Sequence, residues 1–246
     1  MTKIAIIGGT GLTNLEDFTI TSNEILKTPY GETSSELVFG QLGDKEIIFV
    51  ARHGNPHNTP PHKVNYQANI WALHHYQVES IISINTVGGI TAPMYPCRIV
   101  IPDQIIDYTW SRNHTFFEDD INHVTHIDFT HPYDEELRQR IINCCNDLKL
   151  DIYNHAVYGA TQGPRLETIA EIVRMERDSC DLVGMTGMPE AALAKERDIS
   201  YASIALVVNW AAGKTKDIIT MEIIEENLKK GIGNIKQLLN KVIETI

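Results

Sequence analysis

The sequence of 246 residues has few cysteines, few aromatic residues and no long apolar run. No stretch reaches about 18 consecutive apolar residues, the length that a membrane-spanning helix requires. The opening segment, MTKIAIIG, is interrupted by glycine too early for a signal peptide. The four cysteines show no C-x-x-C spacing, which predicts free thiols, and we assign them no chemistry. These absences predict a soluble, cytoplasmic protein that does not bind a membrane.

Positive charge is also scarce. Lys and Arg number 21 against 32 Asp and Glu, for a net charge of −11, and no Lys/Arg-rich run occurs. This balance argues against nucleic acid or an anionic membrane as a partner, and an anionic substrate would need a local positive pocket. The histidines show neither an H-E-x-x-H motif nor a cysteine partner, so we predict no metal site.

Short β-branched segments alternate with segments of helical period, which is typical of a single α/β domain. The predicted strands are Lys3–Ile7, Glu46–Ala51, Ser80–Asn85, Arg98–Ile106, His155–Ala160, Asp181–Met185 and Tyr201–Val208. The predicted helices are Tyr66–Tyr76, Glu135–Leu148, Glu167–Arg177, Pro189–Arg197 and Met221–Ile246. Gly231 and Gly233 are expected to weaken the middle of the last helix.

A glycine-rich turn, GGTGL, follows the first predicted strand. Its backbone N–H groups and the Thr10 hydroxyl could hold a phosphate. A dinucleotide-binding fingerprint would need glycine at Asn14, and a P-loop would need a Gly-Lys-Ser/Thr ending, so neither motif is present. A tight strand-to-loop turn explains these glycines equally well.

Arg52 and His53 follow the second predicted strand, in the segment ARHGNPH. Ligands bind at such strand ends in open parallel sheets, and this pair could clamp an oxyanion. The alternative interpretation is a pair of solvated loop charges. The adjoining glycine and proline, which fix a turn, favour a binding role.

Two further motifs are TQGPRLET at residues 161–168 and GMTGMPE at residues 184–190. Together with GGTG, ARHG and KVNYQAN at residues 63–69, they make the chain resemble the trimeric purine nucleoside phosphorylase and methylthioadenosine phosphorylase family over nearly its whole length. The resemblance implies one domain over residues 1–246, with a central mixed β-sheet flanked by helices. It also implies a homotrimer or a dimer of trimers that acts on a purine nucleoside, with inorganic phosphate as co-substrate and no cofactor.

The resemblance also assigns roles to individual residues. The phosphate-binding positions are Thr10, Arg52, His53, Asn85, Thr86 and Thr186. The substrate-binding positions are Met185 along the ribose, Leu166 on the purine face, His57 in the neighbouring subunit's site and His126 near the 5′ group. Without the resemblance, Met185 and Leu166 would be interpreted as core residues, and Asn85 and Thr86 as a strand end.

The prediction about the purine base of the substrate rests on Asn209 and Glu167. The segment VNWA at residues 208–211 lacks both acids that methylthioadenosine enzymes have there, and Asn209 and Glu167 instead resemble the residues of inosine- and guanosine-cleaving enzymes. An amide can donate to O6 and accept from N7–H, while a carboxylate can accept from N1–H. We therefore expect a 6-oxopurine and assign both residues to catalysis. Asn209 as an ordinary strand-end residue is the alternative.

Residues 108–112, 114–118 and 124–128 resemble the branch of the family that uses methylthioinosine. This resemblance implies phosphorolysis to hypoxanthine and 5-methylthioribose 1-phosphate. A general 6-oxopurine nucleoside phosphorylase and a methylthioadenosine phosphorylase are the next alternatives. Two other classes also stay open: a nucleoside hydrolase, although the chain lacks an aspartate cluster for calcium, and a non-catalytic nucleoside-binding protein.

Overall fold

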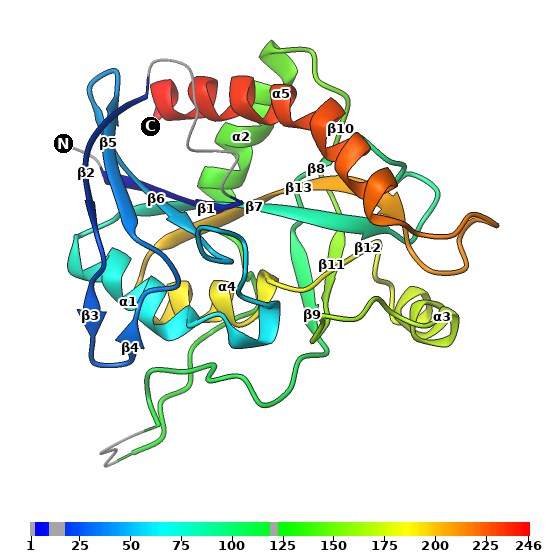
Figure 1. The fold of residues 1–246 in the computed structure, drawn as a ribbon, viewed down its shortest axis with the longest axis horizontal. Helices are drawn as coiled ribbons and strands as arrows, with labels where there is room; N and C mark the ends of the chain where they lie inside the picture. Colours follow the sequence, from blue (N-terminus) through cyan, green and yellow to red (C-terminus); the bar gives the residue numbers. More distant parts are fainter. Residues whose placement is uncertain (1–2, 10–17, 119–122) are drawn as a thin grey trace.

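The computed structural model describes residues 3–9, 18–118 and 123–246 (Figure 1). The strands are β1 (Lys3–Gly8), β2 (Thr19–Glu24), β3 (Lys27–Thr28), β4 (Gly31–Glu32), β5 (Leu37–Leu42), β6 (Lys45–Ala51), β7 (Ser80–Gly89), β8 (Ile99–Val100), β9 (Gln104–Asp107), β10 (Ile152–Tyr153), β11 (Val157–Ala160), β12 (Leu182–Gly184) and β13 (Ser200–Trp210). The helices are the 3-10 helix η2 (Pro61–Lys63), α1 (Tyr66–His75), α2 (Glu135–Asp147), α3 (Ile169–Arg177), α4 (Gly187–Glu196) and α5 (Met221–Thr245).

The described strands other than β3 and β4 form one mixed sheet with the main order β10-β8-β13-β7-β1-β6-β5-β2. Its centre is parallel, because β1 pairs in parallel with β6 and β7, and β7 with β13. β5 continues the sheet in antiparallel fashion beyond β6, and β12 lies antiparallel to the end of β7. The carboxyl ends of β1, β6, β7 and β13 therefore meet at one edge of the sheet.

Helices cover both faces of the sheet (Figure 1): α2 and α5 pack on one face, and α1 and α4 on the other. Successive residues of β1 show why. Ile4 and Ile6 lie in the core cluster that contains the buried residues of α2 and α5, whereas Ala5 and Ile7 lie in the cluster of α1 and α4. A strand that is covered on both faces has no side that faces solvent, so its sequence does not alternate between apolar and polar residues. This explains the continuous apolar segments in the sequence.

The mixed sheet and its flanking helices confirm the predicted α/β class. The predicted strands differ from the structure in two ways: one of them is divided, and other strands were not predicted. The expected strand Arg98–Ile106 is divided into β8 and β9. Pro102 lies between the two parts, where it cannot donate a hydrogen bond to the ladder. β2, β3, β4, β5 and β10 were missed. Every residue of β2 is exposed, so this strand lacks the apolar pattern that identifies a strand.

Helix α3 also differs from prediction at its start. α3 begins at Ile169 rather than Glu167, because Thr168 and Glu171 form a capping box that starts the helix and leaves Glu167 in the preceding loop. α5 continues through both of its glycines, and the expected weakening of the helix stays a prediction. A Cβ on Gly231 would lie 2.5 Å from Leu206 Cδ1, so this glycine permits close packing of α5 on β13.

A long segment between β9 and α2, residues 108–134, contains no helix or strand in its described part. In Figure 1 it extends beyond α1 and α4. None of the helices that the structure describes is long and apolar enough to cross a membrane. Within residues 3–9, 18–118 and 123–246, no group of three His, Cys, Asp or Glu side chains is arranged to hold a metal ion.

Candidate active site

Several of the predicted site residues lie where the strands of the sheet end. The Arg52 amide donates to the Gly8 carbonyl at 3.1 Å, which joins the end of β1 to the residue after β6. Asn209 of β13 and Val183 of β12 flank Gly88 of β7 on its two sides. The structure thus brings the end of β1, the Arg-His pair and the predicted base-binding strand to one edge. Thr10 lies outside the described residues, and its phosphate role stays a prediction.

The Arg52 side chain is 2% exposed, which rules out the solvated-loop interpretation. Its Nε and Nη2 groups donate to the two carboxylate oxygens of Glu190 at 2.6 and 2.7 Å. Further donors reach Ser83 Oγ at 2.6 Å and the Ile84 carbonyl at 3.2 Å. Burial alone would lower the pKa of Arg52, but the charge and hydrogen bonds of Glu190 outweigh it and raise that pKa. Arg52 therefore stays charged, and Glu190 balances its charge.

Glu190 is the residue of this network that the sequence analysis missed. It is 1% exposed and also accepts hydrogen bonds from the Ser83 hydroxyl at 2.8 Å and the Tyr201 hydroxyl at 2.9 Å. The sequence contained one signal for this role, because Glu190 stands between apolar residues at the start of α4. A carboxylate that is buried among such residues needs a charged or hydrogen-bonding partner. The role of Arg52 as a phosphate clamp stays a prediction, because most of its donors are engaged inside the protein.

Asn85 and Thr86 have different environments although they are neighbours in β7. Asn85 is buried, and its amide donates to Ser203 Oγ at 2.7 Å and Ser83 Oγ at 3.2 Å. Its carbonyl oxygen accepts from the Thr186 hydroxyl at 2.8 Å. Thr86 is exposed. Of the two, only Thr86 is open to a ligand in this structure, while Asn85 holds the hydroxyl of Thr186 at the amino terminus of α4.

His53 is half-buried beside Arg52. Its Nδ1 donates to the Thr59 carbonyl at 2.9 Å, so the neutral ring carries its proton there and leaves Nε2 as an acceptor. Burial, followed by the charge of Arg52, lowers the pKa of His53 to about 4. His53 is thus neutral near pH 7, and its ring stacks on His57 with centroids 4.6 Å apart.

The predicted base-binding residues lie on two adjoining segments. The Thr161 hydroxyl donates to Glu167 Oε1 at 2.6 Å, and the Thr161 amide donates to the Gly184 carbonyl at 2.8 Å. Asn209 is largely buried, and its amide donates to the Trp210 carbonyl at 2.8 Å. The ladder between β13 and β7 shifts register between Val207 and Asn209, an irregularity that can redirect a side chain.

The loop after β11, which contains Gly163, packs tightly against Met185, the residue directly after β12. Gly163 has φ of +60°, a conformation that L side chains rarely adopt, and a Cβ there would lie 2.4 Å from Met185 Sδ. Only glycine satisfies both conditions. Leu166, in the same loop, is 43% exposed, which agrees with a side chain placed to meet a ligand or a partner rather than the core.

Comparison with known proteins identifies the family. A sequence profile described as the phosphorylase superfamily matches residues 3–244. The chain belongs to this superfamily. Its membership confirms the family resemblance and the predicted class of enzyme.

Individual relatives of this phosphorylase agree. It is 52% identical to a probable S-methyl-5′-thioinosine phosphorylase from Pseudomonas syringae pathovar tomato, over 99% of both chains. It is 43% identical to a 6-oxopurine nucleoside phosphorylase from Pyrococcus furiosus, over 97% of this chain and 91% of the other. The methylthioadenosine phosphorylase of Schistosoma mansoni in complex with adenine has a TM-score of 0.94 at 28% identity, over 100% of this chain and 92% of that one. These similarities confirm the predicted nucleoside phosphorylase fold.

Of two further predicted substrate residues of the phosphorylase, one contacts the Arg-His pair at the strand ends and the other does not. His57 and His126 are both exposed. His57 contacts the His53 ring, whereas His126 lies in the long segment between β9 and α2. Their roles stay predictions.

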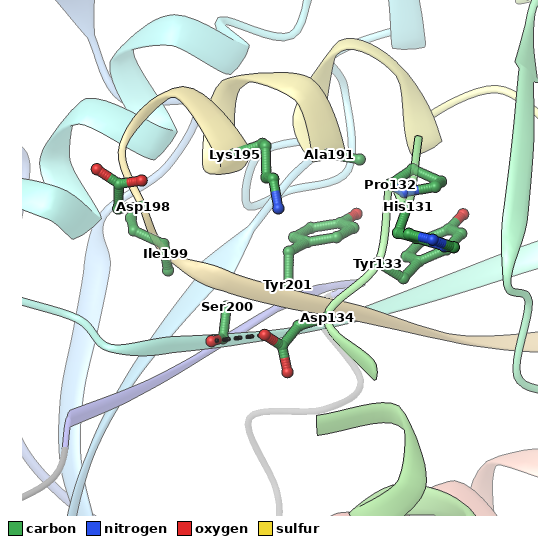
Figure 2. A pocket seen from close by; sticks show the side chains of 10 residues that line it. All are labelled: His131, Pro132, Tyr133, Asp134, Ala191, Lys195, Asp198, Ile199, Ser200 and Tyr201. Carbon is green, nitrogen blue, oxygen red and sulfur yellow. Dashed lines mark hydrogen bonds between the residues drawn. The ribbon is translucent and has the colours of Figure 1, made fainter. Parts of the chain in front are cut away.

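A cavity of about 170 Å³ lies at the other end of β13 (Figure 2). Its lining residues are His131, Pro132, Tyr133, Asp134, Ala191, Lys195, Asp198, Ile199, Ser200 and Tyr201. Ser200 donates to Asp134 Oδ2 at 3.2 Å across it. None of the predicted site residues lines this cavity, and the first residues of β13 lie at the amino ends of the parallel strands. It is therefore separate from the candidate active site of the phosphorylase.

The low pKa of His53 predicts a pH-dependent stability. In the unfolded chain the ring has its ordinary pKa of 6.5, while in the folded chain the pKa is about 4, so the unfolded state binds the proton first as pH falls. Stability is therefore lost below about pH 6.5, by about 2 kcal/mol at pH 5.

Urea unfolding of the wild type and of His53→Asn at pH 7.5 and pH 5 measures this contribution. Asn keeps an amide donor for the Thr59 carbonyl but does not titrate. We expect the free energy of unfolding to fall by about 2 kcal/mol more in the wild type than in the variant. An equal fall in both proteins would show that His53 does not titrate as described.

Proposed function

We propose that this phosphorylase cleaves the N-glycosidic bond of a 6-oxopurine nucleoside with inorganic phosphate. The proposed substrate is S-methyl-5′-thioinosine, and the products are hypoxanthine and 5-methylthioribose 1-phosphate. The observation that carries the choice of base is the pair of Asn209 and Glu167. Because Glu167 Oε1 already accepts from Thr161, the carboxylate presents its other oxygen as an acceptor for N1–H of the base. The Pseudomonas syringae relative supports the choice of the 5′-methylthio group.

The reaction would use bound phosphate as the nucleophile and requires no covalent intermediate. Departure of the purine leaves positive charge on the sugar, which a phosphate anion stabilises before it captures C1′. Holding both reactants together removes a barrier of about 7–11 kcal/mol. The Thr186 hydroxyl would turn from Asn85 to a phosphate oxygen. Asn209 would stabilise the negative charge that develops on the leaving base.

The assembly and surroundings of the enzyme belong to the same proposal. We propose a cytoplasmic homotrimer of one-domain chains over residues 1–246, without a cofactor or metal and with no nucleic-acid or membrane partner. Exposed apolar side chains around the base loop support a covering subunit: Leu166 is 43% exposed and Ile169 63%. The exposure of His57 agrees with a role in a neighbouring subunit's site.

A general 6-oxopurine nucleoside phosphorylase is the second candidate, favoured by the similarity to the Pyrococcus furiosus enzyme over nearly the whole chain. The two candidates share the base and differ at the 5′ position. The long segment over residues 108–134, which contains His126, would decide between a methylthio and a hydroxyl group.

One assay tests these possibilities together. Base release from methylthioinosine, inosine, methylthioadenosine and adenosine is measured with and without phosphate. We expect release only with phosphate, with the highest kcat/KM for methylthioinosine. Equal release without phosphate would indicate a hydrolase, and binding without any release would indicate a nucleoside-binding protein.

A further inference from the structure

Glu167 lies in the loop between β11 and α3, and its contacts differ from those of the next acidic residue along the chain. Glu171 accepts two hydrogen bonds from the Arg165 guanidinium, at 2.7 and 2.8 Å, so the cation of this loop is bound to Glu171. Glu167 instead accepts from a neutral donor, the Thr161 hydroxyl, at 2.6 Å. A neutral donor stabilises a carboxylate without cancelling its charge. Glu167 thus keeps its negative charge for a ligand that meets it.

The geometry of the Thr161 hydroxyl fixes the direction of this hydrogen bond. Its distance of 2.6 Å to Glu167 Oε1 is typical of a hydroxyl that donates to a charged oxygen. The same hydroxyl lies 3.3 Å from the Gly184 carbonyl, which is a longer and weaker alternative. Because a hydroxyl has one proton to donate, the short contact assigns that proton to Glu167. Oε1 is then occupied, and Oε2 is the oxygen that can accept from a ligand.

Thr161 is also fixed more firmly than the carboxylate that it binds. It directly follows β11, which pairs with β12, and its amide donates to the Gly184 carbonyl at 2.8 Å. Its β-branched side chain has few χ1 rotamers. Glu167 has a longer, unbranched side chain and lies outside the sheet, one residue before the cap of α3. The fixed hydroxyl therefore restricts this side chain to conformations in which Oε1 meets it.

The chemistry of the two kinds of base explains why such a donor matters. A purine that covers Glu167 removes water from the carboxylate, and a charged group that loses water needs other hydrogen bonds. With a 6-oxopurine, the Thr161 hydroxyl and N1–H supply one donor to each oxygen. With a 6-aminopurine, N1 is itself an acceptor and meets a charged oxygen. Only a protonated carboxyl group could bind that nitrogen, and a hydrogen bond to the charged form opposes protonation.

We propose that Thr161 is a specificity-determining residue, whose hydroxyl holds Glu167 in one orientation and in its charged, acceptor-only form and so excludes 6-aminopurine nucleosides. It is a positioning residue, because it acts through Glu167 rather than on the base. This inference rests on the proposed cleavage of a 6-oxopurine nucleoside, and it adds the residue that enforces the choice of base.

The test compares Thr161→Val, which removes the hydroxyl and keeps the branched shape, with Thr161→Ser, which keeps the hydroxyl. The measurement is kcat/KM for methylthioinosine and for methylthioadenosine with phosphate present, on protein whose folding is verified by circular dichroism. We expect Thr161→Val to lower the ratio of the first constant to the second about 10- to 100-fold, the effect of losing one hydrogen bond to a charged group. The constant for methylthioadenosine should not fall. Thr161→Ser should keep the ratio within about 3-fold of the wild-type value.

A double substitution separates action through Glu167 from a general effect on the loop. In the Glu167→Ala background, Thr161→Val should change the ratio by less than about 3-fold, because the contact that it removes is already absent. Thr161→Ala is a second variant without the hydroxyl, for use if Thr161→Val does not fold, and it should lower the ratio in the same way.

Several outcomes would overturn the proposal. They are an unchanged ratio in the variants without the hydroxyl, equal losses with both nucleosides, a Thr161→Ser variant as unselective as Thr161→Val, and full additivity with Glu167→Ala. A wild-type enzyme that releases no base in the presence of phosphate, or that cleaves both nucleosides equally well, would instead refute the proposed function.

Discussion

Asn209→Asp is expected to narrow or reverse the preference of the enzyme for a 6-oxopurine. A site built around specific hydrogen bonds can discriminate by about 10⁴–10⁵, and an unpaired buried polar group costs about 1–3 kcal/mol. The wild type should therefore prefer methylthioinosine over methylthioadenosine strongly. Aspartate replaces the amide donor to O6 with an acceptor, which repels a keto oxygen and favours an amino group. The measurement is kcat/KM for both nucleosides.

Glu167→Ala tests the other half of the same site. It should lower activity on methylthioinosine more than on methylthioadenosine, because only the 6-oxo base offers N1–H. Glu171→Ala is a matched control: Glu171 lies four residues further on, but it pairs with Arg165 and caps α3 rather than meeting Thr161. A wild-type enzyme that cleaves both nucleosides equally well would contradict this account of base selectivity.

Glu190→Leu is expected to cause the largest loss of stability. The substitution leaves the Arg52 guanidinium buried without its carboxylate, and breaking such a pair on one side costs about 3–5 kcal/mol. Ser83 and Tyr201 also lose the acceptor of their hydroxyl groups. Urea unfolding without phosphate measures the change in the free energy of unfolding.

Two controls separate the buried pair from a general effect of replacing a charge. Replacing both partners, as Arg52→Met with Glu190→Leu, should recover most of the lost stability, because no uncompensated charge is left. Glu226→Leu removes one partner of the exposed pair with Lys230 and should change the free energy of unfolding by less than about 1 kcal/mol. A loss in Glu190→Leu no larger than in Glu226→Leu would show that the buried pair does not stabilise the fold.

The sequence alone was sufficient for the fold class, and it predicted a site at the ends of the strands. Continuous apolar segments predict strands buried on both faces, and glycine or polar residues directly after them predict a site at the strand ends. β2 could not be found in this way, because every residue of this strand is exposed and its hydrogen bonds to β5 depend on a neighbour in space. The resemblance supplied the site residues that these patterns do not distinguish.

Only the tertiary structure decided what several of these residues contact and how far they are buried. Arg52 and Glu190 are 138 positions apart, so no local pattern shows that one cancels the charge of the other. Asn85 and Thr86 are adjacent in sequence, yet the pleat of β7 buries the first in a polar network and exposes the second. Arg112 donates to the carbonyl oxygens of Thr161 and Met185, which lie 49 and 73 positions further along the chain. The charge balance of a buried site depends on contacts between remote segments, and folding alone brings these together.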